Sequence, residues 1–394
     1  MAPKLTNRWA VLALMVVLRV CFGYQFQTIP PVSGFVMADL GLNYTQLGLL
    51  IGLYLFPGIF IALPGGMLGA RFGDKTILVG GAAMMVLGDV LLGTSNTFAS
   101  ALAGRLIGGA GGVLITVQQA KIVTERFSGR EIATAMSILL AGYPLGIAIA
   151  LAGLGPLAAA TSWQAAILAG AGAIAAAGLL TALLYGNLPA GESASENRPP
   201  RFWHLDWREF KLVCLAGLVW TFFNAAFIVY LGFTPAMLAE GGYSVAAAGF
   251  TVSLTTWVSL VTVPLGGHLT DRTGKGDVFI VFGGVSVALV LAALALGGPP
   301  AVLAVAYGLL LGAVPGAIMT LPGEVLRPES RTTGFGVFYA LYYLGLTLFP
   351  PIAGWLRDAS GEMTLPLLFG AGLMAMTPLA LGVFRLAQRR SPKG

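Results

Sequence analysis

Charged side chains are scarce in this chain of 394 residues, of which only 10% are Asp, Glu, Lys or Arg. A soluble globular chain carries about 25% charged residues. Here 57% of the residues are hydrophobic, and the mean hydropathy is +0.85. Because a soluble fold cannot hide so much apolar surface from water, the composition excludes that class and predicts a protein embedded in lipid.

Histidine and cysteine are scarce too, with two of each. Cys21 and Cys214 fall in apolar segments, one in each half of the chain, where we expect packing residues rather than a disulfide or a metal site. The sequence shows no His/Cys/Asp cluster, nucleophile elbow or phosphate loop, which argues against an enzyme. We expect no metal and no cofactor, apart from a coupled proton. The net charge of +6 is scattered over short loops and forms no basic stripe, so we expect no nucleic-acid partner.

Long intervals without any charge count the membrane spans. No acidic or basic residue lies between Glu131 and Glu192, or between Asp277 and Glu324. A spanning helix needs about 20 apolar residues, so each interval holds two spans joined by a turn. The same rule predicts an all-α membrane protein with twelve spans, at 9–37, 44–69, 76–94, 98–122, 131–155, 163–186, 211–234, 244–269, 277–297, 301–323, 332–355 and 364–387.

A repeated loop divides the chain into two halves. Gly65–Lys75, GGMLGARFGDK, returns about half a chain later as Gly266–Gly276, GGHLTDRTGKG. The repeat predicts two pseudo-symmetric six-helix bundles, 1–187 and 211–394, with a linker at 188–210. That linker is either a solvated tether or, after Pro200, an amphipathic segment at the membrane interface.

Lys and Arg are concentrated in one set of the predicted loops, and only Arg357 falls in the other set. Because positive loops stay in the cytoplasm, we expect both termini and the repeated loops to be cytoplasmic. We expect a multi-pass protein of the cell (inner) membrane.

Further motifs accompany the repeat. The fourth span contains Arg105-Leu-Ile-Gly-Gly-Ala-Gly-Gly112, and the fifth contains Gly142-Tyr-Pro-Leu-Gly146 followed by Gly155-Pro156. With the glycine-rich loops after spans 2 and 8, these motifs resemble the major facilitator superfamily. The stretch Lys121–Met136 is similar to bacterial members near the cyanate and nitroimidazole transporters. The first loop has Ala70 where the family has an acidic residue, which the second loop keeps as Asp271.

The resemblance implies alternating access, with a substrate site between the two halves near the bilayer midplane. Arg19 lies about ten residues into the first span, where a charge costs roughly 2.5–3.5 kcal/mol by insertion scales and marks a functional site by default. It either binds an anionic substrate or is satisfied by helix carbonyls. The residues that we expect to contact substrate are Arg19, Tyr24, Gln25, Tyr54, Gln119, Tyr143, Trp220, Asn224 and Tyr339.

A second group is expected to gate or couple transport. Arg105 shares a helix face with glycines, which favours a structural or gating role, and Lys121 either extends to the lipid headgroups or lines the inner mouth. Asp89 either carries a coupled proton or pairs locally with a backbone donor or Arg105. In the repeated loops, Arg71, Asp271 and Arg272 are expected to form contacts in only one transport state.

The balance of charge inside the predicted spans favours an anionic cargo, because Arg19, Arg105 and Lys121 outnumber the one acid, Asp89. The sequence therefore predicts a monomeric secondary transporter that moves a small, anionic solute by symport or exchange. The alternatives are an efflux transporter for a neutral or amphipathic compound and a membrane sensor that transports nothing.

Overall fold

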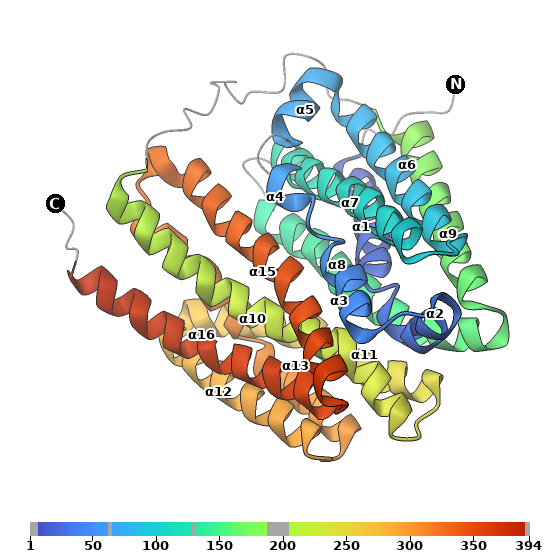
Figure 1. The fold of residues 1–394 in the computed structure, drawn as a ribbon. Helices are drawn as coiled ribbons and strands as arrows, with labels where there is room; N and C mark the ends of the chain where they lie inside the picture. Colours follow the sequence, from blue (N-terminus) through green and yellow to red (C-terminus); the bar gives the residue numbers. More distant parts are fainter. Residues whose placement is uncertain (1–6, 62–64, 128–130, 187–204, 391–394) are drawn as a thin grey trace. The chain divides into compact units, whose positions relative to one another are not determined.

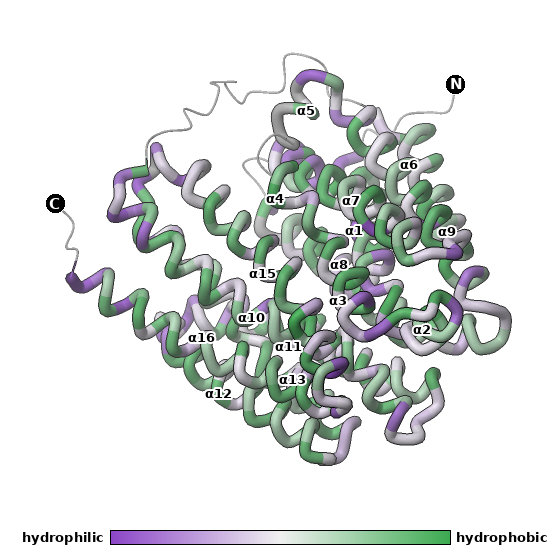
Figure 2. Tube along the Cα trace, viewed as in Figure 1, coloured by the Kyte–Doolittle hydropathy of each residue, from purple (hydrophilic) through white to green (hydrophobic). Residues whose placement is uncertain are grey.

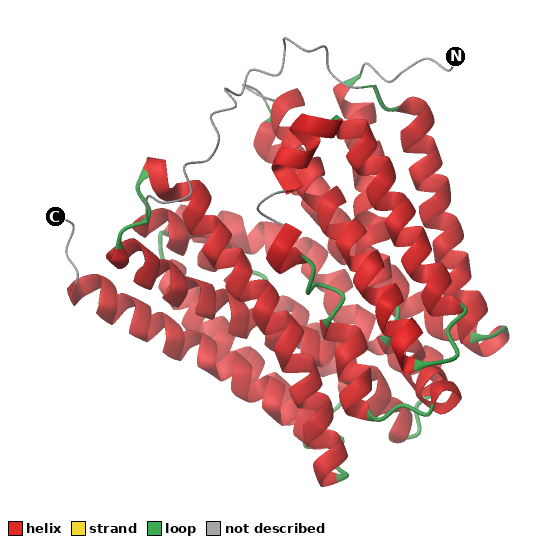
Figure 3. Ribbon diagram, turned by 45° about the horizontal axis from the view of Figure 1, so that its top comes forward, coloured by secondary structure: helices red, strands yellow, loops and turns green. Residues whose placement is uncertain are grey.

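The computed structural model describes residues 7–61, 65–127, 131–186 and 205–390, and all regular structure in these ranges is helical (Figure 3). The first sequence half contains α1 (Arg8–Phe26), η1 (Pro30–Val32), α2 (Ser33–Leu40), α3 (Tyr44–Gly52), α4 (Gly58–Ile61), α5 (Gly65–Phe72), α6 (Asp74–Gly93), α7 (Phe98–Arg126), α8 (Ile132–Ala160) and α9 (Trp163–Leu184). The second contains α10 (Trp207–Glu240), α11 (Val245–Thr273), α12 (Gly276–Ala295), α13 (Pro300–Leu311), α14 (Val314–Val325), η2 (Pro328–Ser330), α15 (Arg331–Ser360) and α16 (Thr364–Arg390) (Figure 1).

Eleven stretches of the described residues are long and apolar enough to cross a membrane. Hydrophobic residues fill the middle of these helices, and hydrophilic residues gather at ends such as those of α10 and α16 (Figure 2). The predicted all-helical membrane fold is therefore confirmed. The predicted number of twelve spans is not exact, because eleven such stretches are found in the described residues.

Three predicted spans are broken in the structure. The span 9–37 divides into α1, η1 and α2, the span 44–69 breaks between α3 and α4, and the span 301–323 divides into α13 and α14. Each break lies at or just before a proline, namely Pro30–Pro31, Pro57 and Pro315. A proline has no N–H to donate and its ring clashes with the carbonyl four residues earlier, so the helix ends there.

Contacts divide the chain into two units. Unit 1 comprises 1–42, 49–197 and 244–250, and unit 2 comprises 43–48, 198–243 and 251–394. The division resembles the predicted halves, except that 43–48 and 244–250 each group with the other half. The first part of the predicted linker, up to residue 204, lies outside the described residues, so its boundaries stay a prediction.

The same pairs of helices pack in both units. In unit 1, α1 packs on α8, and α6 packs on α7 and α9. In unit 2, α10 packs on α15, and α12 packs on α13, α14 and α16. The repeated loop thus reflects a repeated packing scheme, which places matching helix positions in comparable surroundings.

Unit 2 begins with a well-defined helix start. Asp206 and Glu209 form a capping box at the first turn of α10. The buried Glu209 carboxylate also accepts hydrogen bonds from Arg327 Nε at 3.0 Å and Ser330 Oγ at 2.8 Å. These bonds raise the pKa of Arg327 above its ordinary value, because Glu209 stabilises the charged guanidinium. The network ties α10 to η2.

Candidate functional site

Arg19 is held by neutral groups in unit 1. Its guanidinium donates to Thr116 Oγ1 of α7 at 2.8 Å, and lies over the rings of Phe22 and Tyr143 at 5.7 and 5.6 Å. The side chain is half-buried. A hydroxyl and two ring faces orient the guanidinium, whose planar fork of N–H groups matches the two oxygens of a carboxylate.

Close packing of α1 on α8 fixes this position. A Cβ at Gly146 would meet the backbone at Val20 and Tyr24, and one at Gly142 would lie 3.1 Å from Arg19 Cβ. The predicted motif Gly142–Gly146 therefore lets the two helices approach closely. That approach brings Tyr143 beside Arg19.

Four rings connect Arg19 to a deeper polar group. Phe22 contacts Tyr54 and Tyr143 with ring centroids 6.0 and 5.2 Å apart, and Phe26 contacts the same two rings. Tyr54 is fully buried, and its hydroxyl donates to Gln25 Oε1 at 2.9 Å. Arg19 and Gln25 are thus joined through aromatic side chains within one unit.

Arg105 caps the end of α1. Its Nη1 and Nη2 donate to the carbonyls of Gln25 and Phe26 at 2.7 and 2.9 Å, and its Nε donates to the Leu50 carbonyl at 2.9 Å. The guanidinium also lies 4.2 Å from the centroid of the Tyr54 ring. The carbonyl of Phe26 is the one that Pro30 leaves without an intrahelical donor, so this buried arginine replaces a missing helix bond.

Asp89 lies near this cap. It is only 2% exposed, and its Oδ2 has no hydrogen-bond partner among the described residues. Its neighbours are Gln25, whose Nε2 donates to the Met85 carbonyl at 2.7 Å, and Arg105, which interacts with it electrostatically. Arg105 donates to three carbonyls, and no hydrogen bond joins Arg105 to Asp89 in the described residues.

The remaining predicted residues of unit 1 contact other groups. Gln119 is buried and donates to the Met15 carbonyl at 2.8 Å. Tyr24 packs against α9, where a Cβ at Gly170 would lie 2.7 Å from its ring. Lys121 forms ion pairs with Asp74 at 2.9 Å and with Glu125 at 3.8 Å. Asp74 is the first residue of α6, and the sequence did not indicate it as a partner of Lys121.

Unit 2 contains an aromatic cluster that includes the predicted residues Trp220 and Tyr339. Trp220 stacks on Phe338 with centroids 6.3 Å apart and contacts Tyr342 at 6.0 Å, and Tyr339 contacts Tyr342 at 6.2 Å. Asn224 donates to the carbonyl of Trp220 on its own helix. Trp220, Tyr339 and Asn224 are thus brought together, as predicted residues of one aromatic cluster. The indole Nε1 of Trp220 is buried and has no acceptor in the described residues.

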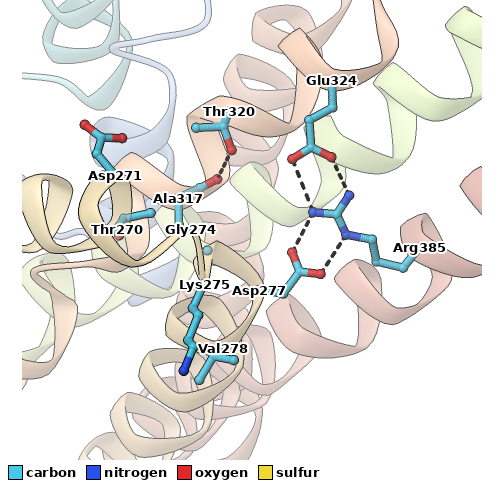
Figure 4. A pocket seen from close by; sticks show the side chains of 11 residues that line it. Thr270, Asp271, Gly274, Lys275, Asp277, Val278, Ala317, Thr320, Glu324 and Arg385 are labelled. Atoms are coloured by element: carbon cyan, nitrogen blue, oxygen red, sulfur yellow. Dashed lines mark hydrogen bonds and ion pairs between the residues drawn. The ribbon is translucent and has the colours of Figure 1, made fainter.

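The second repeated loop borders a cavity of about 380 Å³ in unit 2 (Figure 4). Its wall includes Arg385, which donates to Asp277 at 2.6 and 2.7 Å and also bonds to Glu324. Asp271 lines the same cavity but points away from this cluster, and neither the Asp271 nor the Arg272 side chain has a hydrogen bond among the described residues. Both are exposed, as is Arg71 in the first loop, whose guanidinium lies over Phe72. The cluster of Asp277, Glu324 and Arg385 was missed, because Asp277 and Arg385 lie far apart in sequence and stand at ordinary helix ends.

The sequence of this chain matches one family model and several known transporters. The family model described as the Major Facilitator Superfamily matches residues 15–350. The 3-(3-hydroxy-phenyl)propionate transporter of Escherichia coli K12 is 29% identical over 404 residues, covering 96% of this chain and 95% of the relative. The human Lysosomal dipeptide transporter MFSD1 is 24% identical, covering 93% of this chain and 83% of the relative.

Solved structures share the fold. A bacterial homologue of the human lysosomal transporter Spinster, inward-facing and occupied, aligns with a TM-score of 0.76 at 18% identity and covers 98% of both chains. The inward-open xylose transporter XylE of E. coli aligns with a TM-score of 0.78 at 12% identity and covers 96% of both chains. At these identities the likeness shows the fold alone.

Proposed function

We propose that this chain, which belongs to the Major Facilitator Superfamily, moves small organic carboxylates across the membrane and binds the carboxylate at Arg19. That the chain is a membrane-embedded transporter and not an enzyme follows from its family. The observation that carries the proposal is the placement of the Arg19 guanidinium, which donates to Thr116 Oγ1 and lies over the rings of Phe22 and Tyr143.

The other two cations that the sequence places inside the spans of unit 1 bind groups of the protein. Arg105 is used by three backbone carbonyls, and Lys121 is paired with Asp74. Arg19 is half-buried beside a hydroxyl and two rings, and a carboxylate bound to its guanidinium would gain two charge-assisted hydrogen bonds.

An aromatic carboxylate is the favoured member of this class. The relative that matches nearly the whole chain is named for 3-(3-hydroxy-phenyl)propionate, which is a phenyl ring on a short acid. This chain has the rings of Phe22 and Tyr143 beside Arg19 in unit 1. Ring stacking is worth about 0.5–1.5 kcal/mol beyond burial, which is enough to prefer an aryl acid to acetate.

Other cargoes make different demands on Arg19. A dipeptide, suggested by the MFSD1 relative, also carries a carboxylate but adds an ammonium group. Efflux of a neutral or amphipathic compound would need no carboxylate on the cargo. The same holds for cyanate and nitroimidazoles, the cargoes that the resemblance in the sequence suggests. The charge of the cargo therefore separates these possibilities.

Counterflow in proteoliposomes tests the proposal. Labelled 3-(3-hydroxyphenyl)propionate inside the vesicles is exchanged against the unlabelled acid, its neutral amide or a dipeptide outside. We expect the acid to accelerate exchange and the amide to leave it unchanged. Acceleration by the amide alone would contradict an anion site and favour the neutral cargo.

Arg19→Gln is expected to lower exchange of the acid about 10- to 100-fold, because hydrogen bonds to charged groups contribute roughly 1.5–3 kcal/mol. Arg19→Lys keeps the charge and should lose less. The matched control is Arg8→Gln on the same helix, where Arg8 forms an exposed pair with Glu131. Equal exchange by Arg19→Gln and the control would remove Arg19 from the site.

A further inference from the structure

Asp89 is buried among groups that do not balance its charge. The described residues contain two buried carboxylates, Asp89 and Glu209. Glu209 accepts bonds from Arg327 and Ser330, whereas Oδ2 of Asp89 has no partner. An ionised carboxylate needs donors for both oxygens when it is out of water, and the cost of lacking them is several kcal/mol.

The uncharged titratable and polar groups near Asp89 come from α1 and from the connection between α3 and α4. From α1 these are Cys21, Tyr24 and Gln25, and from the α3–α4 connection Tyr54, all of which are neutral groups at ordinary pH. Helix α9 has no titratable residue, and α5 offers only the exposed Arg71.

Helix α7 supplies the one cation near Asp89. This is Arg105, whose donors go to the carbonyls of Leu50, Gln25 and Phe26. The other charges of α7 lie at its far end, where Lys121 pairs with Asp74 and Glu125. In the arrangement seen here, therefore, no described group provides Oδ2 with a donor.

We infer that Asp89 is the proton-binding site of the transporter: it holds a proton in this arrangement and releases it when the Gln25–Tyr54–Arg105 contacts rearrange. In the loaded form the carboxyl is neutral, so the unpartnered oxygen costs far less. On release the proton leaves to water and the carboxylate gains donors from Arg105 or Tyr54. No other bond is formed or broken.

The same contacts connect Asp89 to Arg19. Phe22 touches both the Arg19 guanidinium and the Tyr54 ring, and the Tyr54 hydroxyl bonds to Gln25, the neighbour of Asp89. A carboxylate that binds at Arg19 would shift Phe22 and Tyr54, and so change the donors available to Asp89. The coupling of the proton to the cargo rests on the proposed function, whereas the presence of the proton on Asp89 does not.

Infrared spectroscopy of the purified protein tests the proton without any substrate. A protonated carboxylic acid in an apolar site has a C=O stretching band well separated from those of ionised carboxylates. We expect this band in the unmodified protein, its reversible loss as pH rises, and its absence in Asp89→Asn. Glu131→Gln, which changes an exposed acid, should keep the band.

Three results would overturn the inference. These are no such band at any pH at which the protein stays folded, a band that Asp89→Asn retains, and a band that persists at every pH. The titration uses the unmodified protein, so poor folding of a variant does not protect the inference from failure. Because the test needs no cargo, it also distinguishes failure of the proton site from failure of the carboxylate proposal.

Coupling is measured in a second experiment with 3-(3-hydroxyphenyl)propionate. In proteoliposomes we expect Asp89→Asn to abolish accumulation driven by an imposed pH gradient while counterflow continues. Accumulation that still follows the pH gradient in Asp89→Asn would show that the coupled proton is carried elsewhere.

Discussion

Unit 1 and unit 2 pack the same pairs of helices but bury different polar groups. Unit 1 buries an acid, an arginine and several amides, including Asp89, Arg105 and Gln25. Unit 2 buries mainly hydroxyls, such as those of Thr255 and Thr256, and its buried acid Glu209 lies in the first turn of a helix. A hydroxyl can bond to its own helix, whereas a buried charge needs partners from other segments.

The difference shows how a repeated scaffold can divide its tasks. In unit 1 the charges depend on contacts between α1, α6 and α7, so any movement there changes their energy strongly. In unit 2 the buried hydroxyls of Thr256 and Thr255 donate to backbone carbonyls of their own helix and of a neighbouring helix, and the cluster of Asp277, Glu324 and Arg385 stands at helix ends. The recognition of charge in our proposal therefore falls to unit 1.

The largest effect that tests this comparison should come from the α1 cap. Arg105→Gln would leave up to three buried carbonyls without donors and is expected to destabilise the fold by about 3 kcal/mol or more. Thr255→Val, which removes a buried hydroxyl bonded to the Ala304 carbonyl, should cost only about 1 kcal/mol. Thermal melting in detergent measures both. Equal shifts would show that the two units depend on buried polar groups to the same degree.

Glycine contacts should give an intermediate effect. A Cβ at Gly88 would lie 2.6 Å from the Gly104 carbonyl oxygen, and backbone cannot yield. Gly88→Ala is expected to cost about 1–3 kcal/mol through overpacking. In unit 2, a Cβ at Gly283 meets mainly the side chain of Val314, which can turn, so Gly283→Ala should cost less.

Gly80→Ala is the matched control on α6, because a Cβ there meets nothing within 4 Å. Alanine is the better helix former by about 0.8–1 kcal/mol, so this variant should be neutral or slightly stabilising. A melting temperature lowered as much by Gly80→Ala as by Gly88→Ala would contradict the packing argument.

The smallest effect is expected at the ion clusters of the two units. Arg385 joins Asp277 and Glu324 between α12, α14 and α16, whereas Lys121 joins Asp74 by a single hydrogen bond. Both cations are partly exposed, so Arg385→Gln should cost about 1 kcal/mol and Lys121→Gln less. Melting at low and high salt checks this, since screening should reduce both differences. A larger loss for Lys121→Gln would reverse the comparison.

Much of the fold was predictable because lipid imposes a strong constraint. Spanning helices must be apolar over their whole length, so charge-free intervals located α8, α9 and α12 to within a few residues. The breaks were harder to predict. Pro144 and Pro156 lie inside the unbroken α8, yet Pro30 and Pro315 accompany breaks. Whether a proline ends a helix depends on what satisfies the freed carbonyl, and for Phe26 that is Arg105, from a distant helix.

The candidate site was predictable in its residue types but only in part in its grouping. Arg19 and Tyr143 come together, as do Trp220 and Tyr339, whereas Gln119 bonds to a backbone carbonyl. A sequence indicates that a polar group is stranded in an apolar span, but the partner comes from another helix. The direction in which each side chain points was therefore unknown.

By itself, the sequence determined the class of protein, because composition decides between water and lipid, and a repeat of half the chain decides between one bundle and two. Only the tertiary structure decided which buried charges are satisfied. Arg105 has three carbonyls, Arg19 lies against a hydroxyl and two rings, and Asp89 keeps an oxygen without a donor. The physical reason is that solvation by lipid depends on composition along the chain, whereas hydrogen bonding of a buried charge depends on contacts between segments that only folding brings together.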